Sequence, residues 1–346
     1  MTNPLYSWQH EPWQQIQALG HRLPHAFLLY GPQGIGKTVF AEHLAQSLLC
    51  EKPGQGGHAC QQCGSCGWFH QYSHPDYRRV RPELLDEEDA PAGDGEAEAV
   101  AKTSKASKAP SKEIVINQIR ALSDFMNIST HRSGRRVIVL YPAEALNVPA
   151  ANALLKSLEE PNADTVFILV SNSIDRLLPT ILSRCHKFGL GQPDTAIALN
   201  WLQQQGIKDA DIWLAQQGGA PLAAMDMAMS ELRTDLDDFL RYLSKPGTEL
   251  SLKTADKMQK LEMPVVVGWL QRWLYDIFSY KQSGRIRYHP RYEKELKALS
   301  AQAEQSTLQQ FIRNCNERQA IASHPLSAKL FLEDMLLEYS ALFGTH

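Results

Sequence analysis

The sequence predicts an α/β protein with a parallel sheet and a phosphate-binding loop, followed by an all-helical C-terminal region. Short apolar runs typical of buried strands alternate with helical patterns between residues 26 and 170. The first of these runs leads directly into a match to the motif G-x-x-x-x-G-K-[ST]. After Pro193 the strand patterns stop, and helical spacing continues from there.

Composition narrows the classes of protein to which the chain can belong. Its 346 residues are enough for two or three domains. A net charge of −3 excludes a molecule that is basic all over, so any contact with nucleic acid has to be local. No apolar run approaches the roughly 20 residues of a membrane span, and the N-terminus lacks the pattern of a signal peptide. We therefore expect a cytoplasmic protein whose six cysteines serve metal binding or packing.

A nucleotide site is predicted directly after the first strand, residues 26–30. Three glycines in the motif permit backbone angles that other residues avoid, so successive N–H groups can turn toward phosphate oxygens. The helix expected over residues 39–49 directs its positive N-terminal end at the same anion. In this motif the lysine reaches the β and γ phosphates and the threonine hydroxyl ligates Mg²⁺. The candidate nucleotide-binding residues are Gly31, Pro32, Gly34, Gly36, Lys37 and Thr38.

A short helix is expected over residues 12–19, ahead of the first strand. It contains Trp13 and follows Trp8. This segment either covers the base of a bound nucleotide or forms a surface helix held by its two tryptophans, and both alternatives stay open on sequence alone.

Four cysteines after the phosphate-loop helix have the spacing of a metal site. Cys50, Cys60, Cys63 and Cys66 form the pattern C-x9-C-x2-C-x2-C, with glycines between them for tight turns. Four thiolates suffice for one tetrahedral Zn²⁺, and a closed ligand set of this kind predicts a structural metal. The alternatives are an iron–sulfur cluster and four unpaired thiols in a loop. We expect a zinc knuckle over residues 50–66.

Residues 86–112 are predicted to be a disordered insertion. Their first half is acidic, their second half carries lysines among Ala, Ser and Pro, and large apolar residues are nearly absent. The basic half is either a solvated linker, which composition favours, or a contact for nucleic acid.

Beyond this insertion the strand and helix patterns alternate again. We expect a helix over 114–127, a strand over 136–141, a helix from 147 that Pro161 stops, and a strand over 165–170. Such alternation predicts a parallel sheet with right-handed crossovers. A packed helix bundle is predicted after residue 193, with helices over residues 196–204, 210–217, 236–243, 263–280, 308–321 and 326–343.

Two further motifs resemble a known family. Residues 150–161, AANALLKSLEEP, and residues 178–185, LPTILSRC, are similar to the bacterial clamp-loader ATPases of DNA polymerase III, which are of the AAA+ type. The phosphate loop and the inserted cysteines fit the same resemblance. It implies a nucleotide-binding domain over residues 1–190, a helical lid over 191–230 and a helical collar over 231–346.

The resemblance also implies partners and a function. Members of the family form a hetero-pentamer of gamma/tau, delta and related subunits, which places a ring-shaped sliding clamp on primed DNA during replication. On this basis we expect a cytoplasmic bacterial subunit of the DNA polymerase III complex. Its implied cofactors are structural Zn²⁺ and ATP with Mg²⁺.

This chain departs from the active members of the family at the positions that cleave ATP. Where active relatives carry Asp-Glu after the second core strand, it has Tyr141 and Pro142, which neither hold Mg²⁺ nor activate water. Ala223 replaces the lid arginine that senses the γ-phosphate, and Asn172 takes the polar position after the third strand. Glu144 lies nearby, but in-line attack demands tight positioning, so we do not expect it to substitute. The prediction is phosphate binding without hydrolysis.

The loop motif TILSRC predicts a role on another molecule's nucleotide. The resemblance implies that Arg184 is an arginine finger that reaches into the neighbouring subunit's site. A guanidinium suits this task because it stays charged and bonds two oxygens at once. The alternative is a solvated loop arginine.

Two rival functions stay open. The first is an active, gamma/tau-like clamp-loader ATPase, against which Tyr141 and Pro142 argue. The second is a zinc-stabilised nucleic-acid-binding module, for which the candidate contacts are Lys281, Arg285, Arg287 and Arg291.

Overall fold

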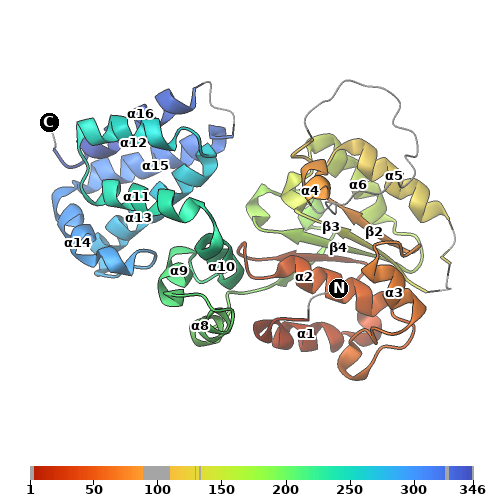
Figure 1. Ribbon diagram of the computed structural model, residues 1–346. Coiled ribbons are helices and arrows are strands. Elements are labelled where there is room, and N and C mark those ends of the chain that lie inside the picture. Colours follow the sequence, from red (N-terminus) through yellow and green to blue (C-terminus); the bar gives the residue numbers. More distant parts are fainter. Residues whose placement is uncertain (1–3, 89–109, 129, 132–133, 324–326, 345–346) are drawn as a thin grey trace, which may run out of the picture. The chain divides into compact units, whose positions relative to one another are not determined.

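The chain forms two compact units, Met1–Gln192 and Pro193–His346. In the described chain, the first unit is a sheet with helices and the second unit is helical (Figure 1). One buried hydrophobic core extends through both 191–230 and 231–346, so the division into lid and collar stays a prediction. The computed structural model describes residues 4–88, 110–128, 130–131, 134–323 and 327–344.

A five-stranded parallel sheet forms the centre of the first unit, with the strand order β2-β3-β4-β1-β5. The side chains of β3 and β4 are buried throughout, and so are those of β1 up to Leu29. Near-continuous apolar runs of this kind are what parallel strands covered on both faces require. The strands are β1 (Ala26–Tyr30), β2 (Tyr77–Val80), β3 (Arg136–Leu140), β4 (Thr165–Ser171) and β5 (His186–Gly189).

The two edge strands are the elements of the sheet that the sequence pattern does not predict. β2 contains Arg78 and Arg79, and β5 contains His186 and Lys187, so neither forms an apolar run. An edge strand has one neighbour only, and charged side chains there protect the open edge from pairing with other chains. Because β2 and β5 are polar, a pattern of consecutive apolar residues does not detect them.

Helices cover both faces of the sheet. In Figure 1, α5 and α6 lie on one face, and α1, α2 and α3 lie on the other. The helices expected over 39–49, 114–127 and 147–160 are present as α2, α5 and α6. The helices of this unit are α1 (His10–Gln17), α2 (Lys37–Leu49), α3 (Gly64–His70), α4 (Glu83–Glu88), α5 (Ile116–Asn127), α6 (Val148–Glu159) and α7 (Pro179–Leu182).

Both ends of the predicted 86–112 insertion belong to the folded chain. α4 continues to Glu88, so residues 86–88 are helical where disorder was expected. The reason is a buried partner, because Asp86 accepts a hydrogen bond of 2.5 Å from the guanidinium of Arg81. At the other end, the backbone N–H of Ser111 donates to the carboxylate of Glu83 over 3.3 Å. Residues 89–109 lie outside the described chain.

The second unit is a bundle of helices around one core, as the sequence predicts. None of the described helices is long and apolar enough to span a membrane. The helices are α8 (Thr195–Gln204), α9 (Ala210–Gln216), α10 (Pro221–Met229), α11 (Leu232–Ser244), α12 (Thr248–Met258), α13 (Met263–Ser283), α14 (Glu293–Gln302), α15 (Gln305–Ile321) and α16 (Ala328–Ala341). The apolar spacing did not predict α10, α12 and α14, and more than half of the residues of α12 and α14 are exposed.

A fully buried carboxylate fixes the loop that follows α13. Asp276 accepts hydrogen bonds of 2.7–3.1 Å from the backbone N–H groups of Arg287, Tyr288 and His289. It also accepts from Nδ1 of His289 over 2.9 Å. Burial lowers the pKa of His289. A buried charge is tolerated only with such partners, so Asp276 determines where the loop lies.

Asp276→Asn should destabilise the chain. The isosteric change creates no cavity, but it turns one acceptor into a donor that faces N–H groups. We expect the free energy of unfolding to fall by about 3 kcal/mol, the typical cost of breaking a buried hydrogen-bonded charge. Chemical denaturation measures this difference, and the exposed carboxylate Asp211 is the control. Equal stabilities for Asp276→Asn and Asp211→Asn would contradict the assignment.

Candidate functional site

The predicted phosphate loop connects β1 to α2 at the carboxyl edge of the sheet. Gly31 has a φ of +155°, and a Cβ there would lie 2.1 Å from the carbonyl oxygen of Leu190, so only glycine fits. Within the described chain, the backbone N–H groups of Gly34, Ile35 and Gly36 donate no hydrogen bond. Successive N–H groups without a protein acceptor are what a phosphate cradle provides.

The N-terminal segment binds the opposite, carbonyl side of this loop. The indole of Trp8 donates to the carbonyl of Ile35 over 3.0 Å, and the amide of Gln9 donates to the carbonyl of Gly36 over 2.8 Å. A Cβ on Gly36 would lie 2.7 Å from the ring of Tyr6, which stacks on Trp8. These contacts fix the carbonyl side of the loop. The sequence does not predict them, although Trp8 lies in the segment for which a cover over the base is one alternative.

A small cavity lies beside this segment. Its volume is about 230 Å³, and its walls include Trp8, Pro12, Ile35 and Leu190. Polar side chains, among them Gln9, Glu11 and Gln15, line it as much as the apolar ones do. Both alternatives for the N-terminal segment therefore stay open.

Lys37 is buried at the start of α2. Its ammonium donates to the carbonyl of Pro32 over 2.5 Å. Burial lowers the pKa of Lys37 to about 8, and the negative charge of Glu144 opposes that shift. One oxygen of Glu144 accepts from the backbone N–H of Asn172 over 3.0 Å, and the other is buried without a partner in the described chain. The structure thus brings Glu144 and Asn172 toward the loop.

Tyr141 takes part in a different set of contacts. Its hydroxyl donates to one carboxylate oxygen of Glu42 on α2 over 3.4 Å, and the hydroxyl of Tyr72 donates to the other over 3.3 Å. The guanidinium of Arg79 lies 3.8 Å from the same carboxylate. Burial raises the pKa of Tyr141 to about 12, so its hydroxyl stays protonated at neutral pH. Tyr141 is therefore a neutral donor committed to Glu42.

Arg184 lies in the turn between α7 and β5, with about a third of its side chain exposed. Its guanidinium forms an ion pair with Glu159 at the end of α6. It also donates to the carbonyl of Thr180 over 2.9 Å and to the hydroxyl of Ser183 over 3.3 Å. Glu159 belongs to the motif of residues 150–161, but sequence reasoning did not pair it with Arg184.

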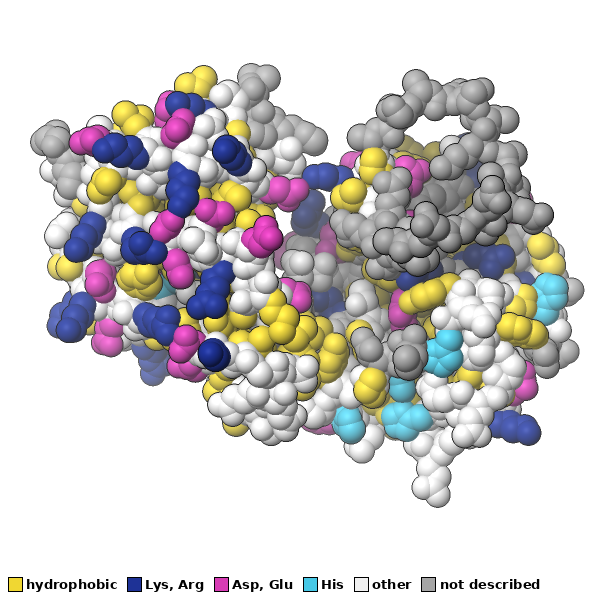
Figure 2. Space-filling model, viewed as in Figure 1, with side chains coloured by type: hydrophobic (Ala, Val, Ile, Leu, Met, Phe, Trp, Pro, Cys, Tyr) yellow, Lys and Arg dark blue, Asp and Glu magenta, His cyan; other side chains and the backbone are white. Residues whose placement is uncertain are grey.

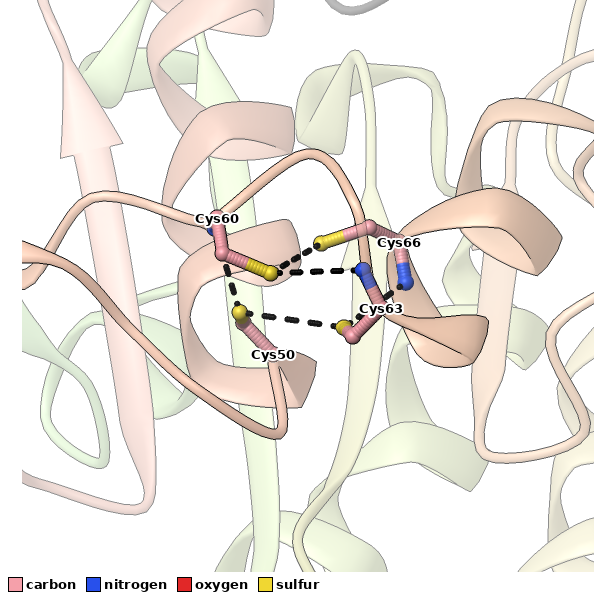
Figure 3. Close-up of side chains that lie close together, drawn as sticks. All are labelled: Cys50, Cys60, Cys63 and Cys66. Atoms are coloured by element: carbon pink, nitrogen blue, oxygen red, sulfur yellow. Dashed lines mark hydrogen bonds between the residues drawn. The ribbon is translucent and has the colours of Figure 1, made fainter.

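The four predicted cysteine ligands come together in space (Figure 3). All four sulfur atoms lie within 4.8 Å of one another. The Sγ atoms of Cys50 and Cys63 are 4.0 Å apart, as are those of Cys60 and Cys66. A tetrahedron with Zn–S bonds of about 2.3 Å places its sulfurs about 3.8 Å apart, so the cluster fits a zinc ion.

Backbone N–H groups complete the cluster. The N–H of Cys60 donates to the sulfur of Cys50, that of Cys63 to Cys60, and that of Cys66 to Cys63, over 3.2–3.4 Å. Backbone N–H groups of Gln62 and Cys63 lower the pKa of Cys60 to about 6, whereas burial raises the pKa of Cys66. Donors aimed at sulfur stabilise the thiolates that ligate metals.

An aromatic cluster attaches this knuckle to the first unit. The indole of Trp13 on α1 donates to the carbonyl of Gly56 over 2.8 Å and stacks on His58. A ring nitrogen of His58 lies 2.9 Å from one of His43 on α2. Trp13 therefore contacts the knuckle, a role that its sequence position did not indicate.

Comparison with known proteins identifies the family. A family model described as "DNA polymerase III, delta subunit" matches residues 9–194, and one described as "DNA polymerase III, delta subunit, C terminal" matches residues 232–341. The chain belongs to the delta′ family of DNA polymerase III clamp-loader subunits. The delta′ subunit of Pseudomonas aeruginosa is 33% identical over 98% of both chains. That of Escherichia coli is 28% identical over 78% of this chain and 75% of its own.

A solved structure from Thermotoga maritima, a DNA polymerase III gamma subunit-related protein, covers 96% of this chain and 99% of its own. It is 18% identical with a TM-score of 0.41. Membership of the delta′ family confirms the predicted fold class: an AAA+-like parallel-sheet domain with a four-cysteine cluster, followed by a helical region.

We expect purified protein to contain about one zinc ion per chain, the number that four thiolates hold. Cys63→Ser should lose most of it and expose residues 50–70 to proteases, while the sheet stays folded because the knuckle is an excursion from it. Mass spectrometry of the metal content tests this prediction.

Cys315→Ala is the matched control, since Cys315 is a buried thiol on α15, outside the cluster. It should retain the zinc. Metal-free wild-type protein with an unchanged melting temperature would contradict a structural zinc site, and bound iron would favour the iron–sulfur alternative.

Proposed function

We propose that the chain works within the clamp-loader pentamer, with gamma/tau and delta subunits, and helps to place the sliding clamp on primed DNA. In this role it binds nucleotide phosphate without hydrolysing ATP and supplies Arg184 to a neighbouring ATPase site. Similarity to delta′ relatives along nearly the whole chain supports its place in the complex.

One observation carries the proposal of binding without hydrolysis. The phosphate loop keeps its glycines, its free N–H groups and Lys37. Yet the position after β3, where active relatives place a metal-holding carboxylate, is Tyr141, whose hydroxyl is committed to Glu42. A neutral phenol cannot replace a carboxylate that positions Mg²⁺.

The setting of Arg184 supports action on another molecule. Its strongest partner, Glu159, is about half exposed, and ion pairs at such sites contribute about 1 kcal/mol or less. A γ-phosphate carries more charge than this carboxylate, so exchanging one partner for the other costs little. Glu159 then holds the guanidinium ready until a neighbour's nucleotide replaces it.

The two rival functions fare differently. Glu144 favours an active ATPase, because it is a carboxylate whose charge acts on Lys37. The nucleic-acid-binding module loses one of its four candidate contacts, because Lys281 donates to the carbonyls of Ser300 and Ala303. Figure 2 shows both signs of charge interspersed over the visible face of the helical unit.

Nucleotide affinity should depend on the charge of Lys37. With a pKa of about 8 in the free protein, Lys37 is protonated at neutral pH and loses its proton above pH 8. Bound phosphate favours the protonated form, so the Kd of a fluorescent ATP analogue should rise above pH 8, by up to about tenfold per pH unit.

Lys37→Met should bind the ATP analogue more weakly at pH 7, and its Kd should not rise above pH 8. Lys187→Met, at an exposed position on β5, should behave like wild type. The prediction fails if the affinity of wild type stays constant up to pH 9.5, or if Lys37→Met binds equally well.

Arg184→Ala should impair the assembled clamp loader and leave the isolated chain folded. A finger contributes about 10³–10⁵ in rate at the site it completes. Since only one ATPase site among several is affected, the total rate of ATP hydrolysis should fall by about a third. Clamp loading should fall further if the sites hydrolyse ATP in a fixed order. Reconstituted complex, assayed for DNA-stimulated hydrolysis and clamp loading, measures both.

Arg184→Lys should rescue little, because an ammonium lacks the planar two-pronged donor. Arg176→Ala removes an exposed arginine from the same segment and serves as the control. If Arg184→Ala assembles normally and both rates match wild type, Arg184 is a solvated loop residue.

A further inference from the structure

A preformed cavity lies between α13 and α15 in the second unit. Its volume is about 670 Å³, within the range of protein ligand sites. Three aromatic rings, Tyr275, Phe278 and Tyr288, line it together with two arginines, Arg272 and Arg313. No carboxylate is among its described lining residues. The cavity is thus apolar and aromatic with a positive charge.

Arg272 is a cation without a counter-ion. Its guanidinium donates no hydrogen bond and forms no ion pair with any residue that the structure describes. Asp276 lies one helical turn further along α13, but both of its oxygens are occupied by the loop that contains Tyr288. Burial lowers the pKa of Arg272. An anion entering the cavity would compensate a charge that the protein leaves unbalanced.

The cavity walls are held in place. The backbone N–H of Tyr288 is bonded to Asp276 over 3.1 Å, and its ring packs edge-on against Tyr275 with centroids 5.3 Å apart. Across the rim, the amide of Gln271 donates to the side-chain oxygen of Asn316 over 2.9 Å, which ties α13 to α15. Rigid walls lower the ordering cost of binding, so a short segment suffices as a ligand.

We propose that this cavity is a docking site for an acidic peptide segment of a partner protein that carries a large apolar or aromatic side chain. The apolar side chain would fill the space between the rings, and a carboxylate would pair with Arg272. Charge complementarity argues for this ligand, since both charged lining residues are arginines. Nucleic acid is less suited, because two arginines, one of them half-buried, do not follow a phosphate backbone.

The test is fluorescence anisotropy on the full chain with a fluorescein-labelled peptide of sequence EEDWLE. We expect a Kd on the order of 10 µM. The peptides KKKWLK and EEDAAE should bind at least about tenfold more weakly. The first lacks the carboxylates that pair with Arg272, and the second lacks the large apolar side chains that fill the space between the rings. Since the measurement uses the isolated chain, its result is independent of whether the chain acts in clamp loading.

Arg272→Met keeps the length of the side chain and removes its charge. It should raise the Kd about tenfold or more, the effect of one charge-assisted contact. Arg241→Met, at an exposed arginine on α11, is the matched control and should bind like wild type. Thermal melting checks that both variants fold.

Three results would overturn the proposal. The first is an affinity for EEDWLE that Arg272→Met leaves unchanged, and the second is no binding at all by a folded wild-type chain. The third is binding of a labelled oligothymidylate that Arg272→Met abolishes while the peptide does not bind, which would make the cavity a nucleic-acid site.

Discussion

The parallel pairing of β1 with β4 and β5 is the constraint on which the candidate site depends. Parallel strands end at the same edge of a sheet, so the phosphate loop after β1, Asn172 after β4 and Leu190 after β5 are brought together. The fit is close enough that Gly31 admits no Cβ against Leu190. Arg184 lies at the opposite end of β5, just before it begins, so the same strand connects both candidate regions.

Under the proposed function, binding and cleavage of phosphate depend on different residues. The loop is held on its carbonyl side by Trp8 and Gln9, which leaves its N–H side for an anion. Cleavage needs a carboxylate after β3, and there Tyr141 turns to Glu42 instead. We infer that one half of the nucleotide site has been kept while the other has become part of the packing.

How far the sequence predicts the structure depends on burial and on distance along the chain. Central strands are apolar on both faces and were predicted nearly to the residue, whereas β2 and β5 carry the charges of edge strands and were not. The cysteine cluster is encoded by local spacing. The contacts Trp13–Gly56 and Arg184–Glu159 join residues far apart in the chain. The spacing of residues along the sequence does not predict contacts of this kind.

The most direct test of this account is steady-state ATP hydrolysis by the isolated full chain. We predict turnover at the background level, equal in wild type, Lys37→Ala and Glu144→Gln, because Tyr141 stands where active relatives carry the carboxylate that positions metal. Turnover clearly above background that disappears in Lys37→Ala would contradict it. If Glu144→Gln abolished it as well, Glu144 would have taken over the role of the missing carboxylate and the chain would be an active ATPase.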